Sequence, residues 1–536
     1  MKTDADFAVS LPPLPLPREM RLWDAGAVAL GLPESLLMEN AGRAAFDVLR
    51  RHVPDIARER IWLFMGGGNN GGDAACLARH LLDAGARPLV LHTKPLGEYR
   101  GAAARHMRLA KAAGVPFAHL RRRMPDNAPP ILVDGLTGAG LAGNLRPPLT
   151  ELVETINGFP ARFVLALDIP SGLDAVTGLP SPVAVKADAT VSFAAAKPGL
   201  VLPWARAFTG RLHVRGIGIP ARVRSQAPCA ARLLDARCLA CLPQYAENSY
   251  KNSFGHVLVI GGIPQYSGAA HLAARAALRA GAGLVSVAAP AKSEGLIKNG
   301  LPEVITLPLG EPGSRTWPDA LPEKLSELLN RCDALVIGPG LGRDREAGAF
   351  LSAVLSLPGR PPAVIDADAL MLLAGHARLP RHIAEDDIIT PHPGEAAALL
   401  GTTAPAVQAD RFAALGALCR LFPCAVILKG AGSLAGKADR PVLISPHDVP
   451  QLAVGGSGDV LAGCLGAFLA GGRSSAARAS LSCAGMGIAL HALAGLECAA
   501  SCPGRGNTAG EIADAIPRAR ANATRADAAA ARALHE

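Results

Sequence analysis

The stretch that decides the fold of this chain is Val454-Gly455-Gly456-Ser457-Gly458-Asp459-Val460-Leu461-Ala462-Gly463. It opens an apolar run, Val460–Leu469, that predicts a buried helix. Glycines let the backbone approach a ligand closely, and the first amides of a helix have no partner within the helix, so this junction suits an anion. Asp459 is then a candidate base beside a phosphate, although an Asp in this place can also simply cap its helix.

Three more polar segments come directly after short apolar strands. Lys429-Gly430-Ala431-Gly432-Ser433 follows the strand 425–428, Asp366 follows 363–365, and Thr390 follows 388–389. A strand that runs into a Lys-Gly turn brings a cation and free amides to a nucleotide phosphate. Parallel strands end at one edge of their sheet, where open α/β sheets bind ligands, so we expect all of these segments to meet there.

The 536 residues are half apolar and divide into two series of alternating strands and helices. Such alternation predicts βαβ units and parallel sheets covered on both faces. The pattern breaks around Pro220 to Asp235, so we expect two α/β domains, residues 1–222 and 236–517, joined by a linker at 223–235. The Ala- and Arg-rich end, 518–536, reads as a frayed helical tail without chemistry.

Composition limits the partners and the compartment. The net charge is +9, but the basic residues are scattered and aromatics make up only 4%, which favours anionic small molecules over nucleic acid. Eleven cysteines without an export signal indicate reduced thiols and a cytoplasmic protein. The segment Cys238-Leu239-Ala240-Cys241 is an isolated cysteine pair, which we do not expect to bind a metal. The most apolar stretch, Ser482–Ala500, contains His491 and Glu497, so we expect a buried helix and no membrane partner.

The first half carries a candidate site of its own. Its glycine-rich segment, Gly66–Asp73, lies between the strand at Ile61 and a helix expected at Ala74, and matches neither G-x-G-x-x-G nor a P-loop. Asp134 and Asp168 each follow a strand, as suits a hard cation and a general base. Either Asp could instead be only a turn residue.

These segments together resemble a known pair of enzymes. The first half looks like the NAD(P)H-hydrate epimerase family in three segments, Asn69–Asp73, Asp134–Gly140 and Asp168–Gly172. The second half looks like the ADP-dependent NAD(P)H-hydrate dehydratase in five, Tyr266–Ala270, Gly338–Gly342, Thr390–Glu395, Lys429–Gly432 and Gly456–Asp459. The order is that of the fused bacterial repair enzyme. The resemblance implies a Rossmann-like three-layer α/β/α domain followed by a ribokinase-like α/β domain.

The resemblance also implies the reactions. Water added to the ring of NADH or NADPH gives R and S hydrates (NADHX and NADPHX) that no longer donate hydride. The first domain interconverts the epimers, with Asp168 as the base or a substrate ligand. The second uses ADP to phosphorylate the ring hydroxyl of the S hydrate, and loss of phosphate restores the cofactor, giving AMP and phosphate. Asp459 would take the hydroxyl proton.

The remaining site residues are carried over by position. A potassium ion in the first domain would be held by Asn70, Asp134 and Ser171. The hydrate would contact Asn69, Asn70, Gly71, Gly72, Asp73, Gly138, Ala139, Gly140, Leu141, Ala142, Gly143 and Asn144 there, and Ala269, Gly342 and His392 in the second domain. The nucleotide, with magnesium, would bind Lys429, Gly430, Ala431, Gly432, Ser433 and Gly458. We expect a homo-oligomer.

One departure and two alternatives accompany this interpretation. The family loop usually ends Asp-Gly, whereas Ala74 follows Asp73 here, which predicts a small change in loop packing. A ribokinase-like kinase of a small alcohol or vitamin precursor is the rival enzyme, because the Gly-x-Gly-Asp segment would serve both. The first domain could also be a binding module without catalysis.

Overall fold

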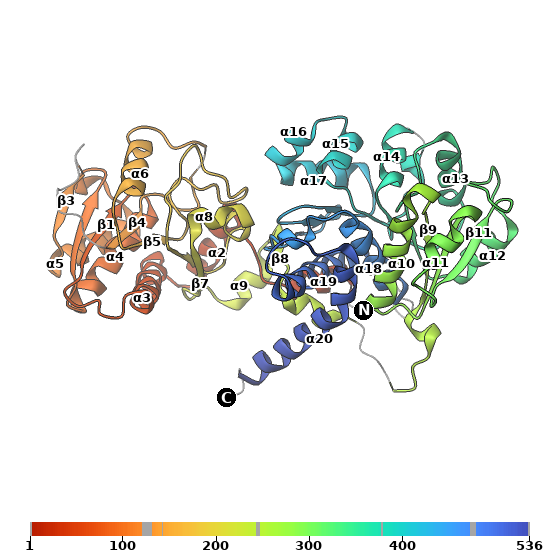
Figure 1. Cartoon of the computed structure of the whole chain (residues 1–536). Helices are drawn as coiled ribbons and strands as arrows, with labels where there is room; N and C mark the ends of the chain where they lie inside the picture. Colours follow the sequence, from red (N-terminus) through yellow and green to blue (C-terminus); the bar gives the residue numbers. More distant parts are fainter. Residues whose placement is uncertain are drawn as a thin grey trace. The chain divides into compact units, whose positions relative to one another are not determined.

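The computed structural model describes residues 3–120, 131–141, 143–242, 247–376, 379–471 and 479–533 (Figure 1). The chain forms two compact units. We call Pro13–Ala231 the N-terminal unit, and Met1–Pro12 with Arg232–Glu536 the C-terminal unit. Each unit has its own sheet and its own hydrophobic core, which confirms two α/β domains.

The described strands of the N-terminal unit form one parallel sheet in the order β3-β2-β1-β4-β5-β6-β7. They are β1 (Arg60–Met65), β2 (Arg87–His92), β3 (Phe117–His119), β4 (Ile131–Gly135), β5 (Phe163–Leu167), β6 (Ala189–Phe193) and β7 (Arg211–Arg215). The helices are α2 (Pro17–Ala29), α3 (Glu34–His52), α4 (Asn69–Asp83), α5 (Gly101–Ala112), α6 (Leu149–Gly158), α7 (Pro198–Val201), α8 (Arg206–Thr209) and α9 (Ala221–Gln226).

Side chains of β1 alternate between two separate cores. Ile61 and Leu63 pack with the apolar faces of α3, α4 and α5, whereas Trp62 and Phe64 pack with that of α6. Successive residues of a strand point to opposite faces, so a sheet buried on both sides reads as one continuous apolar run. The unit therefore has the expected three layers.

The described sheet of the C-terminal unit has the order β11-β10-β9-β12-β13-β14-β15-β16-β17-β8. From β11 to β15 neighbours run parallel, and β16 and β17 add an antiparallel hairpin. The strands are β8 (Ala231–Leu233), β9 (His256–Ile260), β10 (Leu284–Pro290), β11 (Ile305–Leu309), β12 (Ala334–Ile337), β13 (Ala363–Ile365), β14 (Ile388–Ile389), β15 (Ala425–Leu428), β16 (Leu434–Gly436) and β17 (Val442–Ile444).

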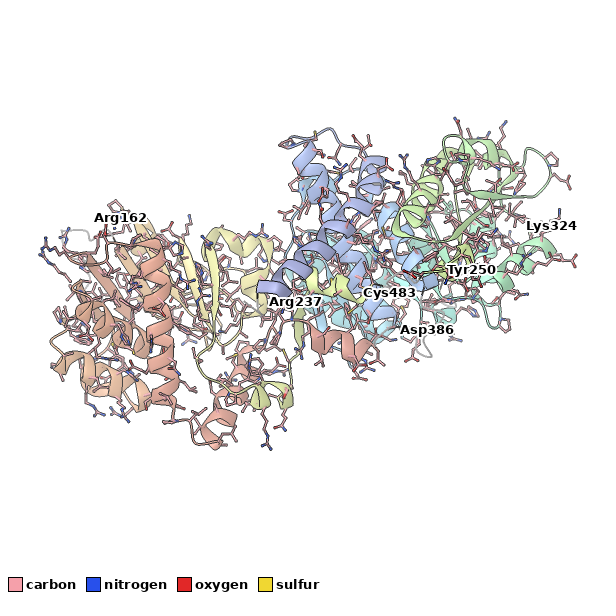
Figure 2. All side chains as sticks on the ribbon, turned by 90° about the horizontal axis from the view of Figure 1, so that it is seen from below. Arg162, Arg237, Tyr250, Lys324, Asp386 and Cys483 are labelled. Atoms are coloured by element: carbon pink, nitrogen blue, oxygen red, sulfur yellow. The ribbon has the colours of Figure 1, made fainter. Side chains whose placement is uncertain are left out.

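Small apolar residues let the helices of this unit pack closely. Its helices are α1 (Asp4–Ser10), α10 (Ser267–Ala280), α11 (Glu294–Lys298), α12 (Glu323–Arg331), α13 (Arg345–Leu355), α14 (Asp368–Gly375), α15 (Pro393–Leu400), α16 (Ala404–Ala409), α17 (Arg411–Leu421), α18 (Ser457–Gly471), α19 (Ser480–Ser501) and α20 (Ala509–Ala533). Helices α10, α18, α19 and α20 build the main core on one face of the sheet. Cys483 of α19, labelled in Figure 2, lies inside it.

Helix α19 is long and apolar enough to cross a membrane, and no other described helix is. About two thirds of its apolar window is buried inside the unit. This burial is what a core helix requires, as the sequence led us to expect.

The contact units depart from the expected boundaries at the start of the chain. The first twelve residues belong to the C-terminal unit, where Phe7 of α1 is fully buried in the main core. Asp4 accepts hydrogen bonds from the backbone N–H and the hydroxyl of Ser482 in α19, at 2.8 and 2.9 Å. The residues expected as a linker, 223–235, contain most of α9 and all of β8, and the two units meet in the sequence at 231/232.

The expected tail is also more ordered than its composition suggested. Helix α20 continues without a break to Ala533, and Ile512, Ile516, Ala519 and Ala523 are buried along it. These spacings of four, three and four residues make one face of a helix, which continues into the tail as far as Ala523. The start of the tail is therefore part of the core.

Candidate active sites

The N-terminal unit contains a cavity of about 570 Å³ at the carboxyl ends of β1, β4 and β5. Its wall includes eight of the residues proposed for hydrate binding or catalysis: Asn69, Asn70, Asp73, Gly138, Ala139, Gly140, Leu141 and Asp168. Gly138 lies beside the Asp168 carboxylate, because a methyl group on it would be in ordinary van der Waals contact with Asp168 Oδ2, at 3.5 Å. The chain thus brings the ends of three neighbouring strands to one cavity.

Asp168 is held in one orientation from several sides. Its φ of +61° is rare for a residue with a side chain, and its own N–H donates to Val191 O at 2.7 Å. Its carboxylate accepts from the backbone N–H of Ala139 at 3.3 Å and forms an ion pair with Lys197. Lys197 is almost fully buried and also donates to Ser192 Oγ at 3.1 Å.

Sequence reasoning missed Lys197. The only signal was a single lysine in the small, apolar segment Ala194–Gly199. A lysine buried there needs an anionic partner, and the partner is the proposed catalytic carboxylate.

Two more carboxyl groups face the cavity. Burial raises the pKa of Asp24 to about 6, opposed by the charge of Lys197. Burial and the neighbouring charge of Asp168 raise the pKa of Asp73 well above its ordinary value. The cavity therefore combines an ion-paired carboxylate with a carboxyl group that favours its protonated form, which is a suitable arrangement for acid and base roles.

The proposed potassium ligands form a connected polar cluster. Ser171 donates to Asp134 through its N–H at 2.7 Å and its hydroxyl at 2.6 Å. Asn70 donates through Nδ2 to Thr137 O at 2.8 Å and to Leu167 O at 3.0 Å, which fixes the orientation of its amide. Asn70 Oδ1 is then buried without a hydrogen-bond partner. A buried oxygen without a hydrogen-bond partner, next to the oxygens of Asp134 and Ser171 as further possible ligands, fits a hard cation.

Burial raises the pKa of Asp134 to about 6, against the hydrogen bonds from Ser171 and Leu136 that lower it. Thr137 connects the two parts of the cluster, since its N–H donates to Ser171 Oγ at 2.8 Å. A cation next to these groups would favour the ionised carboxylate.

Several proposed hydrate-binding residues lie away from the cavity wall. Gly71 and Gly72 belong to the first turn of α4, which begins at Asn69 rather than Ala74, and a methyl group on either would meet backbone or Met38 atoms within 2.7 Å. Their role in the structure is close packing. Gly143 and Asn144 are exposed. Ala142 lies outside the described residues.

In the C-terminal unit the candidate site surrounds the amino end of α18. This helix starts at Ser457, directly after Gly456, whose φ is +91°. A methyl group at Gly458 would lie 3.4 Å from Lys429 Nζ, so the lysine ammonium is next to the helix start. Positive charge and helix-end amides together favour a phosphate there.

Asp459 stands in the first turn of α18 with a strongly altered acidity. Burial and the charge of Asp366 raise its pKa to about 7, opposed by Lys429. A carboxyl group whose pKa lies near neutrality can both accept and release a proton under working conditions. Asp459 therefore has the properties of a general base, and it lies inside the first turn of α18 rather than at the capping position before it.

Asp366 and Glu395 complete the charge cluster around Lys429. Lys429 Nζ lies 2.6 Å from Asp366 Oδ1 and 3.7 Å from Glu395 Oε2. Burial would lower the pKa of Lys429, but the two carboxylates outweigh it and raise that pKa. Burial raises the pKa of Glu395 to about 7, against the effect of Lys429. The sequence indicated that these strand ends would meet, and they do.

A buried arginine supports the turn after β15 through hydrogen bonds to its backbone. Arg411 Nη2 donates to Leu428 O at 3.1 Å and reaches Lys429 O at 3.4 Å and Gly432 O at 3.5 Å. The backbone N–H of Lys429 donates to Pro391 O at 2.9 Å. These hydrogen bonds hold the segment proposed for the nucleotide in place, and sequence reasoning gave no sign of Arg411.

Gly342, His392 and Ala269 follow β12, β14 and β9, so they share the edge of the sheet with Lys429. His392 caps α15, because its Nδ1 accepts from the N–H groups of Gly394 and Glu395 at 3.0 and 3.3 Å. The N–H of Gly342 donates to an oxygen of Asp368 at 3.0 Å. Ala269 is partly buried in the first turn of α10.

Comparison with known families gives a match in each unit. Residues 257–518 match the family model described as NAD(P)H-hydrate dehydratase, and residues 34–199 match that described as YjeF-related protein N-terminus. Both candidate sites lie largely inside these ranges.

Whole-chain relatives match across both units. The chain is 37% identical over 498 residues to the bifunctional NAD(P)H-hydrate repair enzyme Nnr of Moorella thermoacetica, covering 91% of this chain and 92% of that protein. Enzymes of the same description from Coxiella burnetii and Escherichia coli are each 35% identical, covering 89% and 87% of this chain and 93% and 87% of theirs. Among solved structures, the ADP/ATP-dependent NAD(P)H-hydrate dehydratase of Bacillus subtilis, co-crystallised with ATP and Mg²⁺, has 24% identity and a TM-score of 0.47, covering 54% of this chain and 98% of that one.

Proposed function

The chain belongs to the family of bifunctional NAD(P)H-hydrate repair enzymes, and on this premise we propose how its two sites divide the repair of hydrated nicotinamide cofactors. The N-terminal unit is the epimerase and the ribokinase-like C-terminal unit is the dehydratase. The rival kinase of a small alcohol is not favoured, because the relatives match both units under one description.

In the epimerase, Asp168 accepts the proton of the hydroxyl that water has added to the ring. Its fixed orientation in the cavity and its ion pair with Lys197 support this role. As the hydroxyl oxygen becomes a carbonyl, the ring carbon–nitrogen bond breaks, and Asp73, which favours its protonated form, gives a proton to the released nitrogen. When that bond re-forms on the other face of the carbonyl, both proton transfers reverse and the opposite epimer results. The cavity contacts on the hydrate are Asn69, Gly138, Ala139, Gly140 and Leu141.

Potassium is proposed for the cluster of Asn70, Asp134 and Ser171, on the evidence of the orphaned Asn70 Oδ1. When bound, it supplies positive charge beside the cavity. These residues would hold it through amide, carboxylate and hydroxyl oxygens.

In the dehydratase, Asp459 takes the proton of the ring hydroxyl of the S hydrate as that oxygen attacks the terminal phosphorus of ADP. The bond from that phosphorus to the bridging oxygen breaks and AMP leaves. The carbon–oxygen bond then breaks, phosphate departs and a ring proton is lost, which restores the dihydropyridine. Helix-end amides from Gly456 to Gly458 stabilise the charge on the transferred group.

The observation that carries this proposal is the Asp459 carboxyl group, with a pKa of about 7, beside Lys429 at the amino end of α18. Lys429 to Ser433 would receive the nucleotide, with Mg²⁺ on its phosphates. Gly342, His392 and Ala269 would contact the hydrate. A homo-oligomer and a cytoplasmic location remain predictions from the sequence.

The proposal is tested with a mixture of R and S NADH hydrates, Mg²⁺ and either ADP or ATP, following the near-ultraviolet absorbance of NADH. We expect complete, ADP-dependent recovery faster than spontaneous epimerisation. Recovery that stops at the S fraction would remove the epimerase from the proposal. Absence of nucleotide-dependent recovery would remove the dehydratase.

A further inference from the structure

Three potential metal ligands converge between helices α3, α4 and α5 of the N-terminal unit. They are Glu39, Cys76 and His106, one from each helix, and their ligand atoms lie within 4.8 Å of one another. Cys76 and His106 are buried, whereas a third of the Glu39 side chain is exposed. None of the three lines the cavity of the epimerase, so the proposed reaction does not account for them.

The hydrogen bonds leave one lone pair of His106 without a partner. His106 Nε2 lies 2.8 Å from Ser35 O, and because a carbonyl can only accept, Nε2 carries the hydrogen. In the neutral ring Nδ1 is then an acceptor, and it lies 3.6 Å from Glu39 Oε2, which is also an acceptor. His106 Nδ1 is buried and has no hydrogen-bond partner. Two acceptors that face each other in this way need something positive between them.

The distances suit one small ion. Cys76 Sγ lies 3.5 Å from Glu39 Oε2, and His106 Nδ1 lies 3.6 Å from the same oxygen. Tetrahedral zinc with bonds of about 2.0–2.3 Å separates its ligand atoms by roughly 3.3–3.8 Å. Both separations fall within that interval, and the third pair, Cys76 Sγ and His106 Nδ1, lies within 4.8 Å.

Neighbouring groups fix the carboxylate. Arg79 Nη2 donates to Glu39 Oε1 and Oε2, at 2.5 and 2.6 Å, and His80 Nε2 lies 2.9 Å from Oε1. Carboxylates that bind metals are usually hydrogen-bonded from behind in this manner. The negative charges of one thiolate and one carboxylate neutralise a divalent cation, so the site together with Arg79 would carry one net positive charge.

We propose that Glu39 Oε2, Cys76 Sγ and His106 Nδ1 form a three-ligand site for Zn²⁺, with the fourth position open toward the exposed side of Glu39. On binding, the sulfur–metal bond replaces the S–H bond, and the thiol proton passes to solvent. Cys76 lies one turn after Asp73 in α4, so the ion would tie the helix that carries part of the cavity wall to α3 and α5. The site is independent of the proposed reactions.

The test uses the full-length protein after treatment with a chelator, titrated with Co²⁺ as a spectroscopic substitute for Zn²⁺. We expect a thiolate-to-cobalt charge-transfer band that saturates at one equivalent and disappears on addition of Zn²⁺. The band should be lost in Cys76→Ser and remain in Cys229→Ser, a matched control because Cys229 is a buried thiol of the same unit. A band that survives Cys76→Ser, or is lost in Cys238→Ser instead, would overturn the proposal.

A second variant covers the case in which Cys76→Ser fails to fold. Glu39→Gln changes a partly exposed side chain. We expect it to weaken Zn²⁺ binding about 100-fold, because loss of a group that only supports a metal ligand already weakens metal binding by roughly 10–100-fold. At a Zn²⁺ concentration that saturates the wild type but lies below the dissociation constant of this variant, the unfolding temperature of the N-terminal unit should rise in the wild type and not in the variant. Equal affinity in both proteins would contradict the assignment, whatever the stability of the cysteine variant.

Discussion

Asp459 predicts the pH dependence of the dehydratase. Its pKa is raised to about 7, and a general base must be deprotonated to act, so kcat/KM should fall about tenfold per pH unit below that value and level off above it. The measurement is the initial rate on S hydrate between about pH 5.5 and 8.5 at saturating ADP and Mg²⁺.

Glu395 provides the control, because its pKa is also raised to about 7. Glu395→Gln keeps the acceptor for the N–H of His392 and should retain the acidic limb of the profile. If that limb vanishes in Glu395→Gln, the titrating group is Glu395 and the role of Asp459 has to be reassigned.

Lys197 predicts a loss of stability confined to one unit. Lys197→Met leaves the Asp168 carboxylate close to Asp24 and Asp73 without its cation, and removal of one partner of a buried pair costs about 3–5 kcal/mol. Because Asp168 is partly exposed, we expect the lower end, measured by urea unfolding of the N-terminal unit, together with a loss of epimerase activity.

Lys186→Met is the matched control, since Lys186 is an exposed lysine of the same unit. It should change unfolding by less than about 0.5 kcal/mol. Equal unfolding curves for the two variants would mean that the ion pair with Asp168 contributes nothing to the fold.

The conformation of the amino end of α18 should determine how tightly ADP binds. Gly456 has a φ of +91°, and a methyl group there would lie 2.5 Å from Leu272 Cδ1. Gly456→Ala should tilt the helix start and weaken ADP binding about tenfold, which corresponds to about 1.4 kcal/mol. Gly455→Ala should leave the affinity unchanged in the same titration calorimetry, because open space surrounds Gly455. Equal losses in both variants would speak against the helix start as the phosphate site.

Strand ends were the elements most open to prediction. A buried parallel strand is a short apolar run, so the polar residue after it marks the edge of the sheet, and Asp168, Asp366 and Lys429 follow their strands as that rule predicts. Asp134 was expected to follow its strand and is instead the last residue but one of β4. The start of α4 was harder, because Asn69 to Asp73 read as loop residues, yet they form the first turn of the helix. Glycines in this turn lower its helix propensity, so the sequence favours a loop. Their advantage, the close packing of the turn against neighbouring segments, becomes apparent only in the structure.

Pairings between side chains that do not both directly follow a strand could not be predicted. Nothing in the sequence near Lys197 specifies Asp168, and nothing near Cys76 specifies His106 or Glu39. Such pairs depend on which helix or loop lies beside which, and that is settled by the whole core.

The assignment of residues 1–12 to the C-terminal unit can be tested by a substitution in α1. Phe7→Ala removes a fully buried ring from the core of the C-terminal unit and should destabilise that unit by about 3–5 kcal/mol. The N-terminal unit, although adjacent in sequence, should unfold as before. Two-transition unfolding by calorimetry measures this, and a shift of the N-terminal transition instead would contradict the assignment of residues 1–12 to the C-terminal unit.

The domains expected from the sequence are continuous stretches of chain, whereas the C-terminal unit also includes Met1–Pro12. A helix as short as α1 has no preference for either core on its own, and its partner Ser482 lies at the far end of the chain. The tail was expected to be frayed because its alanines and arginines show no clear apolar periodicity, whereas Ala519 and Ala523 at its start are buried.

The central claim is that two independent sites on one chain repair both epimers of the hydrate. The direct measurement is recovery of NADH from the mixed hydrates by the Asp168→Asn protein, by the Asp459→Asn protein, and by an equimolar mixture of these two proteins. We expect recovery of the S fraction alone, no recovery, and complete recovery, respectively. Full recovery at the wild-type rate by Asp168→Asn, or any ADP-dependent recovery by Asp459→Asn at more than about one hundredth of the wild-type rate, would contradict it.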